Sequence, residues 1–109
     1  MLQAGCDGLE DDPQSGLSFS NIGYWQAVER VLKLNKPTLV LGGGGYNPFS
    51  TARAWAGVWG LISGNDPYCC DLPDEASRLL GELNWSHRRA RIKPRRWFER
   101  LYDDDPAQI

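Results

Sequence analysis

The sequence predicts an α/β fold in which parallel strands alternate with helices, because the order strand, loop, helix occurs twice in its first 64 residues. Two strand-like segments carry this prediction. The first is "MLQAG" (1–5), and the second is "KPTLVLG" (36–42), an apolar run that follows a proline. A short continuous apolar run of this kind is typical of a strand buried on both faces of a parallel sheet. The length of 109 residues is about that of one small domain.

The spacing of apolar residues predicts three helices. The first covers about 20–35, where Ser20 or Asn21 can cap the N-terminus. The second covers about 50–63, and the third about 74–83. We expect the tryptophans of the first two helices to lie in the core, although those of the second can also pack behind the loop that carries Tyr46. The apolar residues recur at intervals of three and four, and they are Ile22, Trp25, Val28, Val31 and Leu32, then Ala52, Trp55, Val58, Trp59 and Ile62, then Ala76, Leu79, Leu80 and Leu83.

The sequence changes character after residue 64, so we expect 1–64 to form one unit and 65–109 to add a helix and a basic tail that packs on it. Basic residues interleaved with aromatic ones can bind nucleic acid. Acidic residues close by can neutralise this charge, so we favour a tail that wraps the surface on aromatic anchors. We expect His87 to be solvent-facing or weakly packed, and Asp103 to Asp105 to form a solvated cluster. The tail residues concerned are Arg88, Arg89, Arg91, Lys93, Arg95, Arg96 and Arg100, with Trp85, Trp97, Phe98 and Tyr102 as anchors.

Composition limits the cellular setting and the partners. The net charge of −2 gives no general attraction to nucleic acid. The three cysteines form neither a paired disulfide framework nor a CxxC metal motif. We therefore expect a cytoplasmic protein without a membrane partner, because no window is long and apolar enough to span a bilayer. Cys6 is expected to be a small buried residue, with a metal ligand as the alternative.

The most informative stretch is "TLVLGGGGYNPF" (38–49), where four glycines separate a strand from a helix. In open α/β sheets ligands bind at this end of the strands, and glycine lets the backbone approach a ligand closely. A phosphate loop would need a lysine and a serine or threonine after the glycines, but Tyr46, Asn47 and Pro48 follow instead. A plain structural turn and a site that presents Tyr46 both stay open.

Asp7 follows the first strand, in "QAGCDG". If both strands belong to one parallel sheet, Asp7 and Tyr46 emerge at the same edge. A carboxylate beside a tyrosine hydroxyl suits a metal hydrolase, because the carboxylate can hold a cation and the hydroxyl can donate to a developing oxyanion. An aspartate that caps its own loop is the alternative, and periodicity does not decide between them.

The segment "QAGCDGLEDDP", followed by "LVLGGGGYNPFSTARAWAGVWG", resembles the C-terminal part of the histone deacetylase family, specifically its bacterial acetoin-utilisation branch. The resemblance covers about residues 1–64 closely and extends loosely through Leu72 and Pro73. It implies a three-layer α/β fold with a mainly parallel sheet, related to that of arginase. It also implies an enzyme that hydrolyses acetyl-lysine or a similar small acetamide with a zinc-bound water.

The resemblance assigns roles to individual residues. Asp7 matches an aspartate ligand of the catalytic zinc, and Tyr46 matches the tyrosine that polarises the acetyl carbonyl and stabilises the oxyanion. Gly43, Gly44 and Gly45 match glycines that line the acyl-lysine channel. Gln14 falls where relatives place Leu or Met at the channel rim, and Asp11 where many eukaryotic relatives have Gly. A polar rim leaves the preferred acyl substrate open.

The remaining zinc ligands and the pair of general-base histidines of the family have no match here. We therefore expect the sequence to be the C-terminal portion of a deacetylase and to be inactive alone, because catalytic zinc normally has three protein ligands. The alternative is a non-catalytic binding fragment that uses its basic tail. We also expect the first strand to expose an unpaired edge that favours aggregation.

Overall fold

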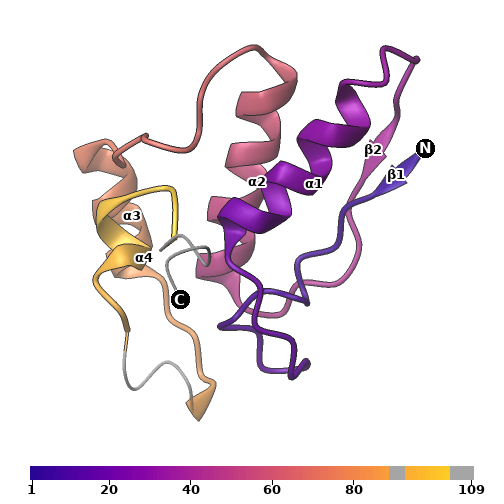
Figure 1. Ribbon diagram of the computed structural model, residues 1–109. Coiled ribbons are helices and arrows are strands. Elements are labelled where there is room, and N and C mark those ends of the chain that lie inside the picture. Colours follow the sequence, from indigo (N-terminus) through magenta and orange to yellow (C-terminus); the bar gives the residue numbers. More distant parts are fainter. Residues whose placement is uncertain (89–92, 104–109) are drawn as a thin grey trace.

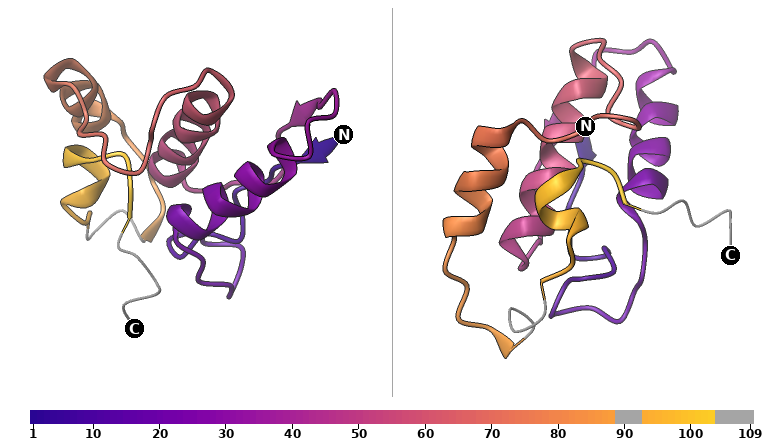
Figure 2. Two further views of the ribbon diagram at one scale, coloured as in Figure 1. Left: turned by 45° about the horizontal axis from the view of Figure 1, so that its top comes forward. Right: turned by 90° about the vertical axis from the view of Figure 1, so that its left-hand side faces the viewer.

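Strands and helices alternate through the first part of the chain, as the sequence predicts (Figure 1). The computed structural model describes residues 1–88 and 93–103. Its elements are β1 (Leu2–Gln3), α1 (Asn21–Leu32), β2 (Val40–Leu41), α2 (Pro48–Ile62), α3 (Asp74–Glu82) and α4 (Arg96–Glu99). Figures 1 and 2 show α2 between α1 on one side and the pair of α3 and α4 on the other. Within these described residues, no helix has the length and apolar character that crossing a membrane requires.

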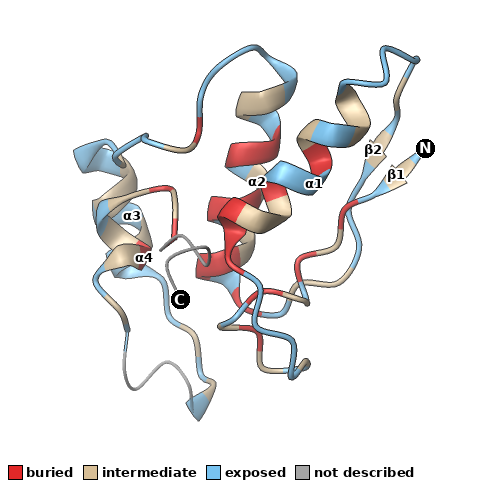
Figure 3. Ribbon diagram, viewed as in Figure 1, coloured by how far each residue is buried: buried red, intermediate tan, exposed pale blue. Residues whose placement is uncertain are grey.

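The two strands pair in parallel, with Leu2 opposite Val40 and Gln3 opposite Leu41. Leu2 and Val40 pack against the core, whereas Leu41 is 40% exposed. The prediction that the second strand is buried on both faces is therefore wrong. Side chains alternate along a strand, so one face of the strand pair packs on the core and the other face is open to solvent. Figure 3 shows this as tan and pale blue strands, which are intermediate and exposed.

The core lies between α1 and α2 and is centred on Trp25, whose side chain is completely buried. Its indole Nε1 donates a hydrogen bond to the carbonyl of Ala54 at 2.9 Å. A Cβ at Gly57 would lie 2.1 Å from the Trp25 ring, so only glycine allows the two helices to approach this closely. The predicted tryptophan positions are thus confirmed for Trp25. They are wrong for Trp59, which is 68% exposed.

Side-chain caps set where the helices begin. The hydroxyl of Ser20 accepts a hydrogen bond from the backbone N–H of Gly23 at the start of α1. At α2 the side chain of Asn47 accepts from the N–H groups of Phe49 and Ser50, and Pro48 occupies the first turn. This cap starts α2 two residues earlier than apolar spacing alone predicts.

The part of the tail that the structure describes, 93–103, packs on the helices. Trp97 is buried and stacks on Phe49 with 4.9 Å between ring centroids. Ser77 of α3 donates to the carbonyl of Phe98 in α4. His87 is partly buried and stacks on Trp85, so it is packed more firmly than expected. Arg89 and Arg91 of the predicted basic run lie outside the described residues.

Candidate active site

The ends of the two strands bring Asp7 against the glycine run. The N–H of Cys6 donates to the carbonyl of Gly44 at 2.6 Å. A Cβ on Gly44 would lie 2.6 Å from Cγ of Asp7, so a side chain at this position would displace the carboxylate. Asp7 itself is exposed. The structure therefore joins Asp7 to a point two residues before Tyr46, as expected from the parallel pairing.

The neighbouring glycines are needed for close approach within the chain. A Cβ on Gly43 would lie 3.3 Å from Cα of Gly5. Gly45 has a φ of +147°, and a Cβ there would lie 2.7 Å from Oγ1 of Thr51. Side chains are disfavoured at such a φ and at such distances. The run thus serves as a tight structural crossing as well as the segment that leads into Tyr46.

Cys6 is buried beside this crossing, in agreement with its predicted role as a small buried residue. Burial raises the pKa of its thiol, and hydrogen bonding to the Tyr24 hydroxyl opposes this. A raised pKa keeps the thiol protonated near neutral pH, whereas metals bind the thiolate. All three cysteines, Cys6, Cys69 and Cys70, are free.

Asp12 holds the backbone that carries Tyr46. Its side chain is 1% exposed. One carboxylate oxygen, Oδ2, accepts from the N–H of Tyr46 at 2.8 Å, and the other, Oδ1, accepts from the N–H of Gln14 at 2.8 Å. Tyr46 leaves 51% of its surface exposed. Sequence patterns do not mark Asp12 as a site residue, because its only signal is the Asp-Pro pair of a turn.

Asp11 and Asn47 connect the same loop to its surroundings. The side-chain amide of Asn47 donates to the carbonyl of Asp11 at 3.0 Å. The carboxylate Oδ2 of Asp11 accepts from Nε1 of Trp97 at 2.9 Å and pairs with the guanidinium of Arg96. The tail therefore reaches the loop that lies beside Tyr46.

A buried ion pair fixes the end of the described tail. Nη1 of Arg53 lies 2.9 Å from Oδ1 of Asp103, and the two side chains are 2% and 10% exposed. Burial lowers the pKa of the Arg53 guanidinium, and the Asp103 charge opposes that shift. The prediction of a solvated Asp103 to Asp105 cluster is wrong for Asp103, while the other two aspartates lie outside the described residues.

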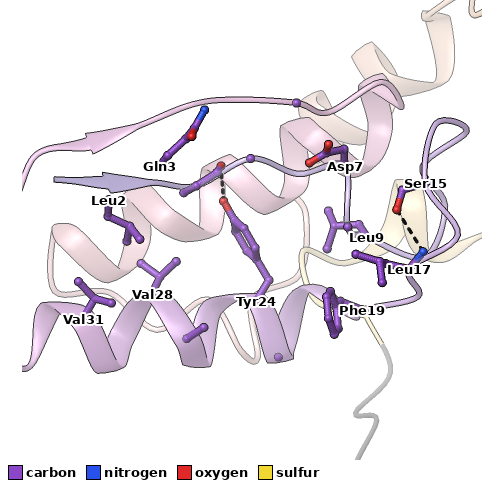
Figure 4. A pocket seen from close by; sticks show the side chains of 16 residues that line it. Leu2, Gln3, Asp7, Leu9, Ser15, Leu17, Phe19, Tyr24, Val28 and Val31 are labelled. Carbon is purple, nitrogen blue, oxygen red and sulfur yellow. Dashed lines mark hydrogen bonds between the residues drawn. The ribbon is translucent and has the colours of Figure 1, made fainter.

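A groove of about 810 Å³ runs between β1 and α1 (Figure 4). Its walls are mainly apolar and include Leu2, Val28 and Val31. Of the predicted site residues, only Asp7 and Gly44 line it. Gln14, Gly43, Gly45 and Tyr46 do not line it, so the groove contains only part of the predicted site.

The described residues do not form a metal site by themselves. No group of three or more His, Cys, Asp or Glu side chains converges among them. Asp7 offers one exposed carboxylate, and the single histidine of the sequence stacks on Trp85 in the segment that follows α3. A catalytic zinc needs about three protein ligands. The donor set of the described residues therefore falls short of such a site.

Comparison with known proteins gives the class. The family model for the histone deacetylase domain matches residues 1–62, and the chain belongs to this family. The backbone also superposes on a crystal structure of an HDAC homolog from Aquifex aeolicus with a TM-score of 0.83 and 31% identity, covering 94% of this chain and 27% of that one. An HDAC homolog complexed with SAHA gives the same values. The chain thus adopts part of the arginase/deacetylase α/β fold.

Individual relatives are histone deacetylases as well. The chain is 34% identical over 74 residues to "Histone deacetylase 8" of Danio rerio, which covers 68% of this chain and 19% of the relative. It is 36% identical over 74 residues to "Histone deacetylase 8" of Xenopus laevis, covering 68% of this chain and 22% of the relative. The chain therefore spans about a fifth of the length of these relatives.

Proposed function

We propose that this chain is the part of a zinc-dependent deacetylase that presents Tyr46 to the carbonyl of an acetyl-lysine or a similar small acetamide. The observation that supports this is the meeting of two strand ends, where Asp7 touches Gly44 and an exposed Tyr46 follows two residues later. The crystal structure of an HDAC homolog complexed with SAHA supports an acyl-lysine type of ligand for the family. We assign one zinc ligand to Asp7, with the others supplied by parts of the domain outside this sequence.

Amide hydrolysis passes through a tetrahedral intermediate whose oxygen carries negative charge. A preorganised O–H donor aimed at that oxygen stabilises it, and removal of one such donor typically costs about 10²- to 10³-fold in kcat. Tyr46 supplies the O–H group, and its backbone is fixed through Asp12. The zinc, when bound in the complete domain, would supply the activated water.

The substrate preference depends on Gln14 in this proposal. Its side chain is exposed, while its N–H is fixed by Asp12. Members of the family that this sequence resembles carry Leu or Met at the rim. A polar side chain at this position should favour a more polar acyl substrate, such as the small acetamides expected for the acetoin-utilisation branch. Gln14→Leu should then raise turnover of an acetyl-lysine peptide relative to a small polar acetamide.

The experiment is a chimera in which this chain replaces the matching 27% of the Aquifex aeolicus homolog. Turnover of an acetyl-lysine peptide and bound zinc are measured for the chimera and its Tyr46→Phe variant. We expect kcat to fall by about 10²-fold or more with zinc content unchanged. Asp7→Asn should instead lower the zinc content. A folded, zinc-loaded chimera whose turnover does not depend on Tyr46 would contradict the proposal.

The basic tail gives the alternative function less support. Arg95 pairs with Glu99 at 2.7 Å, and Arg96 pairs with Asp11. Each guanidinium already faces a carboxylate, so release of either one toward a phosphate would first break an ion pair. We therefore do not propose the binding fragment as a second function.

A further inference from the structure

The buried carboxylate of Asp12 has an unusual pair of partners. Each of its two oxygens accepts one backbone N–H, from Tyr46 and from Gln14, and both distances are 2.8 Å. Taking a carboxylate out of water is costly unless hydrogen bonds replace the water. Hydrogen bonds from N–H groups to an ionised oxygen are among the stronger ones in proteins. Asp12 thus ties two residues that lie 32 positions apart to one buried group.

The pair of hydrogen bonds that Asp12 accepts requires an aspartate at this position. An ionised carboxylate has acceptors on both oxygens, whereas an asparagine has one acceptor oxygen and one NH₂ donor. At position 12, an asparagine could accept from the N–H of Tyr46 or of Gln14, and its NH₂ group would face the other N–H. The sequence choice is therefore explained by the need to satisfy both donors.

Tyr46 depends on its backbone for orientation. Among the described residues, no hydrogen bond holds its hydroxyl, and half of its surface is exposed. Its N–H is held by Asp12, and the next residue, Asn47, is buried and caps α2. The backbone from which the ring projects is thus held on both sides. Loss of the Asp12 bond would release the N-terminal half of this support.

The adjacent Asp11 extends the support to the tail. Its carboxylate binds Trp97 and Arg96, and its carbonyl accepts from Asn47. Arg96 also lies 3.4 Å from Oδ1 of Asp103. A packed tail therefore holds the loop from one side while Asp12 holds Tyr46 from the other.

We propose that Asp12 is the positioning residue that fixes the backbone of both Tyr46 and the rim residue Gln14. We also propose that Asp11 anchors the loop that contains Asp12 to the C-terminal tail. The inference rests on the proposed function, because it gives Tyr46 the task of reaching the acyl carbonyl. Asp12 acts through Tyr46 and does not itself touch the substrate. The buried carboxylate of Asp12 thus positions the residue that carries the reacting hydroxyl and the residue at the channel rim at the same time.

The first test uses the whole chain and does not depend on activity. Amide hydrogen exchange by NMR is measured for Tyr46 and Gln14 in the unmodified chain, in Asp12→Asn, in Asp12→Ala and in the exposed control Asp7→Asn. We expect protection of about tenfold or more at both amides in the unmodified chain and in Asp7→Asn. One amide should lose protection in Asp12→Asn, and both in Asp12→Ala.

Unprotected Tyr46 and Gln14 amides in the unmodified chain would overturn the proposal, and this result needs no variant to fold. Retained protection of both amides in a folded Asp12→Ala chain would overturn it as well. The anchor is tested by Asp11→Asn, which should raise exchange at Tyr46 less than Asp12→Ala does. No change in Asp11→Asn would remove the tail from the proposal.

The second test uses the chimera described above and separates positioning from general damage. Asp12→Asn should lower kcat by about tenfold or more on the unmodified background and have little further effect on the Tyr46→Phe background. Equal losses on both backgrounds would indicate a merely structural role and contradict the proposal. If the folded, zinc-loaded chimera is active but insensitive to Tyr46→Phe, the proposed function fails while the exchange result still decides whether Asp12 fixes the backbone.

Discussion

The molecule has two regions that differ in whether their charged side chains are buried with partners or exposed to solvent. The packed half comprises α1, α2, the loop 9–12 and residues 94–103, and it buries charged groups such as Asp12, Arg53 and Asp103 with partners inside the chain. The open edge comprises β1, β2 and Asp7. It exposes an aspartate and apolar strand residues and borders an apolar groove.

This contrast shows which part of the proposed site the chain builds for itself. The position of Tyr46 is determined inside the packed half, by a buried carboxylate and a helix cap. Asp7 stands on the open edge, and the described residues form no group of three or more His, Cys, Asp or Glu side chains that could hold a metal. In the proposed site, the described residues would thus organise the tyrosine side, and the metal side would need donors beyond Asp7.

The largest effect should come from the centre of the packed half. In Gly57→Ala the new methyl group would lie 2.1 Å from the buried ring of Trp25, and the helices must separate to admit it. Overpacking together with strain on the Trp25 to Ala54 hydrogen bond should cost about 4 kcal/mol of unfolding free energy. Urea unfolding followed by circular dichroism measures the loss.

Gly81→Ala is the matched control for this change. Gly81 also lies in a helix, but nothing stands within 4 Å of the position that its Cβ would take. The substitution should stabilise the chain by about 0.5–1 kcal/mol because alanine has the higher helix propensity. A Gly57→Ala variant as stable as Gly81→Ala would show that α1 and α2 are less tightly packed than their contact indicates.

The next effect tests whether the tail belongs to the packed half. Asp103→Asn removes the charge that faces Arg53, whose side chain is 2% exposed. An uncompensated buried charge typically costs about 3–5 kcal/mol, and we expect about 3 kcal/mol by urea unfolding because Arg53 keeps its bond to the carbonyl of Arg100. The exposed pair of Glu82 with Arg78 gives the control Glu82→Gln, which should cost less than about 1 kcal/mol. Equal costs for both would place Asp103 in solvent.

The sequence revealed the order of elements because apolar spacing is a local signal. It placed α1, α2 and α3 within a few residues and identified the parallel strands. It failed where burial depends on what lies opposite. Trp59 belongs to the same predicted apolar stripe as the buried Val58, yet 68% of its surface is exposed. The sequence does not mark Asp103 as buried, because its partner, Arg53, is 50 positions away.

Asp12 shows a second limit of the same reasoning. Its partners are backbone N–H groups, and every residue other than proline has one. No residue type at position 46 or position 14 therefore marks the contact. The resemblance to the deacetylase family pointed to Asp7 and Tyr46 through their side chains, but the group that holds Tyr46 in place is visible only in three dimensions.

A smaller, pH-dependent effect is expected where α1 meets the chain before α3. The hydroxyl of Tyr68 donates to Oε2 of Glu29 at 2.6 Å, and this bond lowers the pKa of Glu29. A lowered pKa in the folded state means that ionised Glu29 favours folding. Its contribution is present above the ordinary glutamate pKa of about 4.3 and is lost as the pH falls through the lowered folded value.

Glu29→Gln should therefore reduce the unfolding free energy near pH 7 by less than about 1 kcal/mol, since the side chain is partly exposed. Urea midpoints of the two proteins should converge as the pH is lowered from 7 toward 3. The control is Glu75→Gln at an exposed position of α3. A difference that stays constant across this range would contradict the role of the charge.

The smallest effect on stability should come from the open edge itself. Asp7→Asn keeps the shape of the side chain against Gly44 and removes a charge that is exposed to solvent. We expect the unfolding free energy to change by less than about 0.5 kcal/mol. Equilibrium dialysis with zinc should likewise give only weak binding for this chain and for Asp7→Asn, because one carboxylate supplies about a third of a usual ligand set. Tight zinc binding that is lost in Asp7→Asn would break the comparison, since the open edge would then complete a metal site from the chain's own residues.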